Sequence, residues 1–221
     1  PLLVLALALA ACGPAAAPDA EVVTTTVPTP EQDLASVALG LLDAGSFRFG
    51  IAIEGPPIQV DALGGLSLAA AEGVAVLPDQ AQGDASGSIG PLPLTAPFVA
   101  IGPDLWLANP LGGWLELEAA EVVDIPGVAA GLPRILAEDV TQVVAEEVDG
   151  ITAFRGTLDT AGLSTLAGGH LGVGQTALRA STDLDGNLAL VVFEDPVEIG
   201  RIWTFSFSEP GVEAEVVAPP S

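Results

Sequence analysis

The first apolar pattern along the chain is that of an amphipathic helix. Thr29 is a suitable N-cap, Pro30 fits the first helical position, and Gln32 completes a capping box. Gly45 supplies a stop. The apolar positions that recur at helical spacing on one face are Leu34, Val37, Ala38, Leu41 and Leu42.

The pattern then changes to the period of two that is typical of strands. Apolar residues alternate with small or charged ones over 47–53, which predicts a strand with one buried face. From about Val60 to Leu117 the chain predicts short strands between Gly/Pro turns. Within this run, 105–107 and 114–117 flank a turn at 109–113 and predict a hairpin.

The second half of the chain continues with short helices and further strands. We expect a short helix at 132–136 with Pro133 near its start, and a second one at 160–166. The expected strands are 140–148, 151–158, 176–184, 188–193 and 202–207. This order predicts an α+β fold, a large curved antiparallel sheet with a few helices on one face.

Composition narrows the classes of function. Half of the residues are apolar, but aromatic residues make up only 5% and Tyr and Met are absent. The chain has no Lys, 5 Arg and 29 carboxylates, for a formal charge of −24. Such a surface repels nucleic acid and anionic headgroups, so nucleic-acid binding is excluded and membrane association needs a source other than charge. The high content of acidic residues is also typical of proteins from salt-adapted organisms.

The N-terminal segment predicts export and lipidation. Residues 2–11 form an uncharged apolar run of signal-peptide length, too short to span a bilayer, with Ala10 and Ala11 before Cys12. This resembles a bacterial lipobox, in which the cysteine becomes the acylated first residue, and acyl chains such as palmitate give stable anchoring. The alternative is an ordinary secretory signal with a chance cysteine. Cys12 is the only cysteine, so no intramolecular disulfide forms.

The expected organisation follows from this segment. We assign 1–11 to a signal peptide, 12–29 to the lipidated N-terminus and a flexible tether, 30–217 to one folded domain, and 218–221 to a disordered tail. The Pro- and Thr-rich tether would span about 20–25 Å as a coil. The expected location is the extracytoplasmic face of the cell membrane.

The sequence gives little evidence for a catalytic site or a metal site. His170 is the only histidine and lies in a Gly-rich loop, so it is interpreted as structural, and no nucleophile elbow is present. Paired carboxylates such as 146–147 and 194–195 point to opposite faces of strands and are interpreted as a solvated acidic surface. The segment 183–187 is interpreted as a hairpin turn because it lacks the ligands of a calcium loop. We therefore expect no enzyme, no metal and no cofactor.

The apolar residues of the predicted helices have two possible roles. They either pack helices onto the sheet as core, or line an apolar cavity that helices and sheet leave between them. The candidate cavity-lining residues are Leu34, Val37, Leu41, Leu42, Leu132, Ile135, Leu136, Leu163 and Leu166.

The order of several segments resembles the LppX/LprG family of mycobacterial lipoproteins. The segments are the lipobox and tether, 41–46 before the first strand, 104–107 with Gly112-Gly113-Trp114, 131–136 followed by 148–151, and the turn 184–188. The resemblance implies a LolA/LolB-like half-open barrel with helices on its concave face. It also implies a cavity that holds acylated lipids or glycolipids, which are carried or presented across the envelope, with an envelope lipid transporter as partner.

Two other functions remain as alternatives. One is a lipid-anchored scaffold or partner-binding protein with a filled core and no lipid cargo. A more distant one is an esterase that uses a serine and His170, which would need a serine and a carboxylate beside that histidine.

Overall fold

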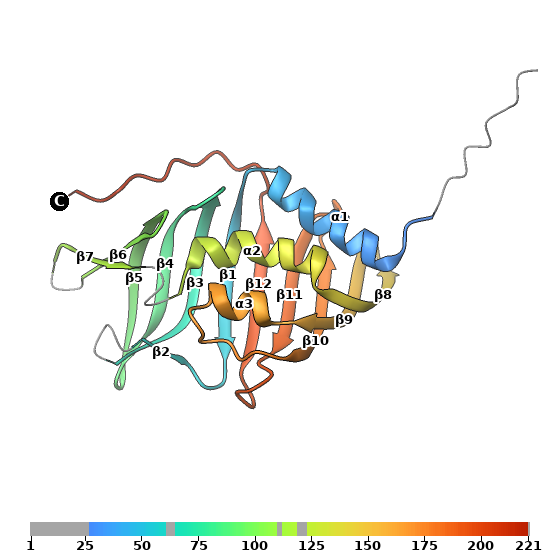
Figure 1. Ribbon diagram of the computed structural model, residues 1–221. Coiled ribbons are helices and arrows are strands. Elements are labelled where there is room, and N and C mark those ends of the chain that lie inside the picture. The colour runs from blue at the N-terminus through green and yellow to red at the C-terminus, as the bar shows by residue number, and fades with distance from the viewer. Residues whose placement is uncertain (1–26, 61–64, 110–111, 119–122, 221) are drawn as a thin grey trace, which may run out of the picture.

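The fold is a single curved antiparallel sheet with three helices on one of its faces (Figure 1). The structure is a computed structural model that describes residues 27–60, 65–109, 112–118 and 123–220. The helices are α1 (Pro30–Asp43), α2 (Ile125–Glu138) and α3 (Ala161–Leu166). The predicted capping box of α1 is confirmed, because Thr29 accepts from the backbone of Gln32 and the Gln32 side chain accepts from that of Thr29.

Twelve described strands form the sheet, which does not close into a barrel. Eleven of them follow the order β7-β6-β5-β4-β3-β1-β12-β11-β10-β9-β8, and β2 pairs with β3 beside this path. The predicted α+β class with a large antiparallel sheet is confirmed. The strands are β1 (Ser46–Glu54), β2 (Ile58–Val60), β3 (Leu66–Val76), β4 (Gln80–Ile89), β5 (Leu92–Ile101), β6 (Asp104–Ala108), β7 (Trp114–Glu118), β8 (Val140–Val148), β9 (Ile151–Asp159), β10 (Gln175–Thr182), β11 (Leu188–Glu194) and β12 (Ile202–Ser208).

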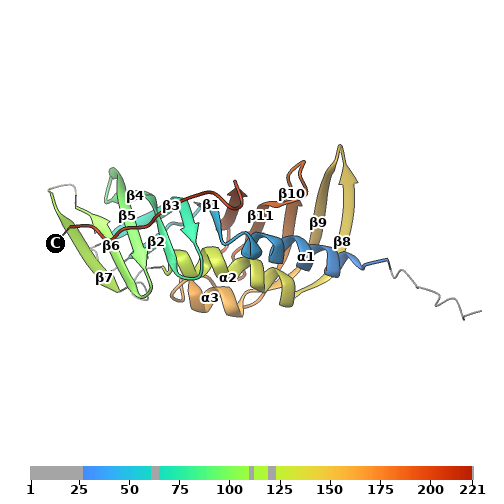
Figure 2. The same ribbon diagram turned by 90° about the horizontal axis from the view of Figure 1, so that it is seen from above.

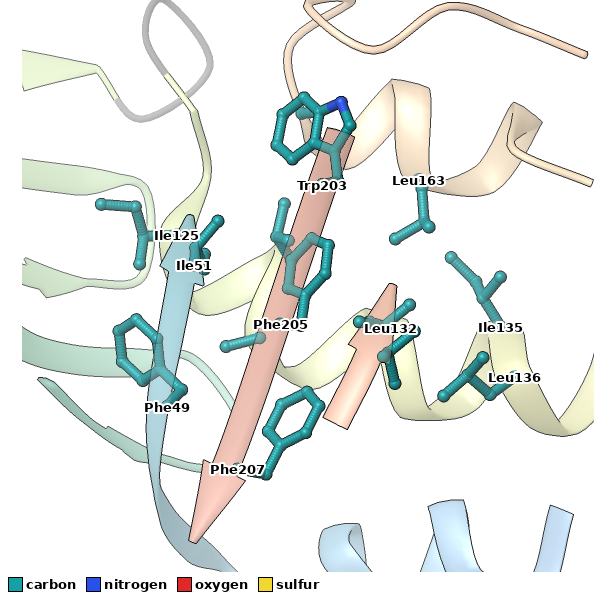
Figure 3. Packing of buried hydrophobic residues seen from close by; sticks show 14 of the residues in the cluster. Phe49, Ile51, Ile125, Leu132, Ile135, Leu136, Leu163, Trp203, Phe205 and Phe207 are labelled. Atoms are coloured by element: carbon teal, nitrogen blue, oxygen red, sulfur yellow. The ribbon is translucent and has the colours of Figure 1, made fainter. Parts of the chain in front are cut away.

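The face of the sheet that carries the helices, here called the inner face, holds the core. On β1 and β12 every second side chain is buried there, as the period of two predicts. Trp203 and Phe205 of β12 stack with 6.1 Å between ring centroids, and Phe205 stacks on Phe193 at 5.8 Å. Figure 3 shows Trp203, Phe205 and Phe207 of β12 beside Leu132 of α2 and Leu163 of α3. Helices and sheet therefore share one hydrophobic core.

Two glycines face each other at close range in β3 and β4. Gly73 and Gly83 are directly opposed on the inner face. A Cβ atom at Gly73 would overlap the carbonyl oxygen of Gln82, and one at Gly83 would overlap that of Glu72. Only glycine allows the neighbouring backbones to approach so closely. This pair therefore permits the close approach of β3 and β4 within the curved sheet.

The helix layer lies over part of the inner face only. Helix α1 packs against β1, β8 and β11, and α2 packs against α1, α3, β3, β4 and β8. Figure 2 shows the three helices together along one side of the sheet, while β5, β6 and β7 extend past their end.

One side chain joins α1 to an edge of the sheet. The Glu31 carboxylate Oε1 accepts the backbone N–H of Val143 at 3.2 Å. Val143 lies in β8, where the pairing with β9 shifts register between Thr141 and Val144. This bond satisfies a donor that the bulge leaves without a strand partner. Hydrogen bonds from the backbone of Glu31 itself and of Val143 lower the pKa of the Glu31 carboxyl.

The end of the described chain is fixed to the start of β1. The Ser46 carbonyl accepts the N–H of Gly211 at 2.7 Å, and Ser46 Oγ donates to the carbonyl of Val212 at 2.6 Å. The segment after Ser208 then follows the strand ends toward β5 without helix or strand (Figure 1). The expected tail at 218–221 lies within it, except that residue 221 is outside the described residues.

Two sequence predictions need correction. The helix expected at 132–136 begins seven residues earlier, at Ile125, so Pro133 lies inside α2 and not near its start. The Ile125-Pro126-Gly127 segment is typical of a loop, but Asp124 caps it by accepting from Gly127 at 2.9 Å, and its apolar residues are buried. The strands β3, β4 and β5 have 10 or 11 residues and are longer than the short strands expected.

Candidate functional site

The predicted cavity-lining residues come together, but as packed core. Six of them are less than 9% exposed, namely Leu34, Leu41, Leu132, Ile135, Leu136 and Leu163. Val37 and Leu166 are partly buried against this core, and Leu42 is half-buried. Figure 3 shows Leu132, Ile135 and Leu136 of α2 near Leu163 of α3. The space between helices and sheet is filled there in this conformation.

An apolar cavity lies at the other end of the inner face, between strands. It has a volume of 10 Å³, about that of one water-sized probe. Its walls come from β3, β4, β5 and β6, namely Leu66, Leu68, Ala85, Ser86, Gly87, Leu94, Ala96 and Leu107. We call this the strand cavity. Gly87, Ala85 and Ala96 have short or no side chains, so the space between the surrounding leucines is not filled.

Apolar surface continues from the strand cavity to solvent. Ile89 and Leu92, at the β4–β5 turn, are 47% and 69% exposed, and Leu115 of β7 is 40% exposed. Pairing places Ile89 opposite Leu66 and Leu115 opposite Leu107, so all three lie on the inner face. The part of this face past the helices thus presents leucine and isoleucine side chains to water beside a small apolar cavity.

The outer face carries two adjoining grooves that are lined by both polar and apolar residues. The larger one has a volume of 720 Å³ and the second one 330 Å³, and the two share Gly50, Glu72, Asp84 and Ser206. The larger groove is bounded by Arg48, whose Nε lies 2.9 Å from Glu209 Oε2, and by Trp114. Neither groove has the apolar lining that an acyl chain would need.

The residues considered for metal or catalytic chemistry have structural surroundings. Asp183 Oδ1 accepts the N–H groups of Asp185 and Asn187 at 2.9 and 2.8 Å, which gives the predicted hairpin turn. Partial burial raises the pKa of this carboxyl, but these hydrogen bonds outweigh it and the net pKa is lowered. The carbonyl of His170 accepts from Arg201 Nη1 at 3.0 Å. Among the described residues, no group of three or more His, Cys, Asp or Glu is placed to hold a metal ion.

The predictions for the N-terminal segment concern residues outside the described ranges, because the structure describes nothing before Val27. They concern the signal peptide, Cys12 and most of the tether. Within the described ranges, no helix is long and apolar enough to cross a membrane.

Sequence reasoning missed the strand cavity, although a signal for it was present. Leucine occupies every second position at 92–94 and 105–107, and these leucines face the same side as Leu66 and Leu68. The alternation identifies an apolar face, but only the pairing order of the strands shows that it extends past the helices.

Comparison with solved structures places this fold. LprF from Mycobacterium bovis superposes with a TM-score of 0.67 at 15% sequence identity, over 87% of this chain and 97% of that protein. The lipoprotein LppX from Mycobacterium tuberculosis gives a TM-score of 0.55 at 15% identity, over 83% and 98%. A LolA superfamily protein from Nitrosomonas europaea gives 0.33 at 12% identity, over 83% and 93%. No protein-family model and no curated protein sequence matches the chain. The chain therefore has the LprF- and LppX-like fold.

Proposed function

We propose that this chain, with its LprF- and LppX-like fold, is a lipid-anchored envelope protein that binds the acyl chains of lipids or glycolipids and carries or presents them across the cell envelope. The observation that carries the proposal is the strand cavity and the exposed apolar residues that lead to it. A soluble domain leaves such side chains exposed at a cost unless they meet an apolar partner. Its structural neighbour LppX is described as a lipoprotein, which supports the same interpretation.

The binding energy would come from desolvation of the acyl chain. Each methylene that leaves water contributes about 0.8 kcal/mol, which corresponds to about fourfold in affinity. The ligand headgroup would stay outside, because no charged side chain lines the cavity. The Ser86 hydroxyl lies 3.0 Å from Thr95 Oγ1 on the outer face and is not directed into the cavity. A volume of 10 Å³ holds no acyl chain, so loading requires the cavity walls to separate.

The elements packed around the strand cavity indicate in which direction its walls can separate. Helix α2 packs against β3 and β4, the strands that supply Leu66, Leu68 and Gly87. When α2 moves away from these strands, the cavity extends under the helix toward Leu132 and Ile135. The residues predicted from the sequence, on α1, α2 and α3, would then line the loaded cavity. They are Leu34, Val37, Leu41, Leu42, Leu132, Ile135, Leu136, Leu163 and Leu166.

The decisive experiment is native mass spectrometry of the non-acylated domain, purified from its own host. Co-purifying lipid supports the carrier. A fluorescent long-chain fatty acid then measures affinity in the parent chain and in Ala96→Phe, which fills the strand cavity. The matched control is Ala70→Phe, which adds the same ring on the outer face. We expect a loss of about tenfold or more for Ala96→Phe and little change for Ala70→Phe.

The second candidate is a lipid-anchored scaffold without cargo, and the filled core around Leu132 is the observation that favours it. It predicts that no lipid co-purifies and that the fatty acid binds equally weakly to the parent chain and to both variants. That result would remove the carrier function.

Anchoring through Cys12 is a separate part of the proposal. It rests on the lipobox-like segment and on the lack of any basic cluster in a chain of formal charge −24. Cys12→Ala should release the protein from membranes into the soluble fraction. A variant that stays with the membrane would contradict this anchor.

A further inference from the structure

Two arginines lie side by side on the outer face of the sheet. Arg155 of β9 and Arg179 of β10 are directly opposed across the antiparallel pair. Both side chains are exposed. Side chains in this relation have Cβ atoms about 4.5–5.5 Å apart, so the two guanidinium groups reach the same volume of solvent.

This pairing is unexpected in so acidic a chain. Only 5 basic residues stand against 29 carboxylates. Arg48 forms an ion pair with Glu209, and Arg201 forms one with Asp195. Arg155 and Arg179 form no ion pair or hydrogen bond with any residue in the described ranges. Like charges that are directly opposed on neighbouring strands repel each other, and an anion between them removes this repulsion.

The residues in the same cross-strand row are uncharged. Val144 of β8 is opposite Arg155, and Val192 of β11 is opposite Arg179. The nearest carboxylates on this face, Glu146 and Glu194, lie in the adjoining rows, opposite Ala153 and beside Ala177. The arginine pair is thus flanked by apolar side chains along the row and by one carboxylate on either side.

A hollow adjoins the pair. It has a volume of 280 Å³, close to the lower end of small-molecule sites. Its lining includes Arg179 together with Ala177, Val192, Glu194 and Ile202. A ligand whose anionic group meets the arginines would place its remaining atoms here, beside apolar side chains and one carboxylate. The hollow therefore favours a neutral or cationic remainder and disfavours a second anionic group.

We propose that Arg155 and Arg179 together bind the phosphate group of a small phosphate ester whose remaining part occupies the 280 Å³ hollow. Guanidinium groups bind phosphate through two parallel N–H···O bonds, and two of them match the several oxygens of one phosphate. This site lies on the face opposite the strand cavity, so it does not depend on the proposed lipid function and is no part of the acyl site.

The test is calorimetric titration of the full chain with inorganic phosphate and with glycerol phosphate. Sodium concentration and ionic strength are matched with sodium chloride, because cations alone stabilise a chain of this negative charge. We expect saturable binding of both probes, with glycerol phosphate the tighter one because its glycerol part enters the hollow. Absence of binding, or heat that chloride reproduces, would overturn the proposal.

Two variants and a control locate the site. Arg155→Gln and Arg179→Gln should each weaken phosphate binding by about tenfold or more. Arg134→Gln removes the same charge from an exposed position on α2 and should leave affinity unchanged. Equal loss in all three variants would mean a general charge effect and would refute the site. Vesicles that contain phosphatidylglycerol are the final probe: binding to vesicles without binding to soluble phosphate also refutes it, because a membrane surface would then be the ligand.

Discussion

Arg201 and Asp195 form a buried ion pair, with 3.4 Å between Nη1 of the arginine and Oδ2 of the carboxylate. Arg201 also donates through Nε to the carbonyl of Pro56 at 2.8 Å, and through Nη1 to that of His170. Asp195 Oδ1 accepts the N–H groups of Val197 and Glu198, each at 2.9 Å. The pair thereby connects three turns: the one after β1, the loop before β10, and the β11–β12 connection.

Removal of the arginine should destabilise the fold strongly. Arg201→Met leaves the Asp195 carboxylate buried without its cation, which costs about 3–5 kcal/mol for such pairs. Arg48→Met is the matched control, since its pair with Glu209 is exposed, with side chains 51% and 59% accessible. That change should cost at most about 1 kcal/mol. Urea denaturation measures both, and equal losses would show that the Arg201 pair has no special role.

The same carboxylate should make stability depend on pH in acid. Burial raises the pKa of Asp195, but hydrogen bonds from Glu198, Val197 and Gly172 outweigh it and the net pKa is lowered. The pKa of Asp195 is therefore lower in the folded than in the unfolded protein, where it is about 3.9. The ionised carboxylate stabilises the fold fully above the unfolded pKa, and this stabilisation is lost as the pH falls through the folded pKa. The unfolding free energies of the parent chain and of Asp195→Asn should therefore converge in acid. A difference in unfolding free energy between the two proteins that stays constant from pH 7 down to about pH 2–3 would contradict this prediction.

Two glycine substitutions, one in the β3–β4 pair and one in helix α1, should change stability in opposite directions. In Gly83→Ala, the added Cβ overlaps the Glu72 carbonyl oxygen and lies 2.7 Å from the Cα atom of Gly73, so the sheet must move. We expect a loss of about 1–3 kcal/mol or more. Gly40→Ala adds a methyl group in helix α1 with nothing within 4 Å, and should stabilise by about 0.5–1 kcal/mol. Thermal unfolding gives both signs, and a stabilised Gly83→Ala would show that the close approach of β3 and β4 does not need glycine.

Lipid loading should be visible in hydrogen exchange. If α2 moves away from β3 and β4 to admit an acyl chain, amides of α2 around Leu132 and Leu136 should change their exchange on addition of lipid. Because α2 also packs against β8, the internal control is restricted to the turn of the β8–β9 hairpin, at Asp149 and Gly150. Changes confined to β3–β6 would mean that the helix-facing leucines do not line the loaded cavity.

Sequence reasoning succeeded where local rules determine structure. The capping box at Thr29 and the alternation along β1 depend on neighbouring residues, and the structure confirms both. It failed at α2, where Pro126, Gly127 and Pro133 indicate a loop locally but burial of the surrounding apolar residues stabilises a helix. The strand cavity depends on which strands pair across long sequence separations, which local pattern does not specify.

The bond between Glu31 and Val143 has a mechanical consequence. The chain enters α1 through Val27 to Thr29, and α1 packs against the edge strand β8 as well as the central strands β1 and β11. A force applied to the N-terminal end therefore reaches the sheet first through α1, with Glu31 as its attachment to the outermost strand. A pulling force from that side would act first on one edge of the sheet and would separate the helix layer from it. Strands β4–β7, at the opposite edge, would carry little of this force.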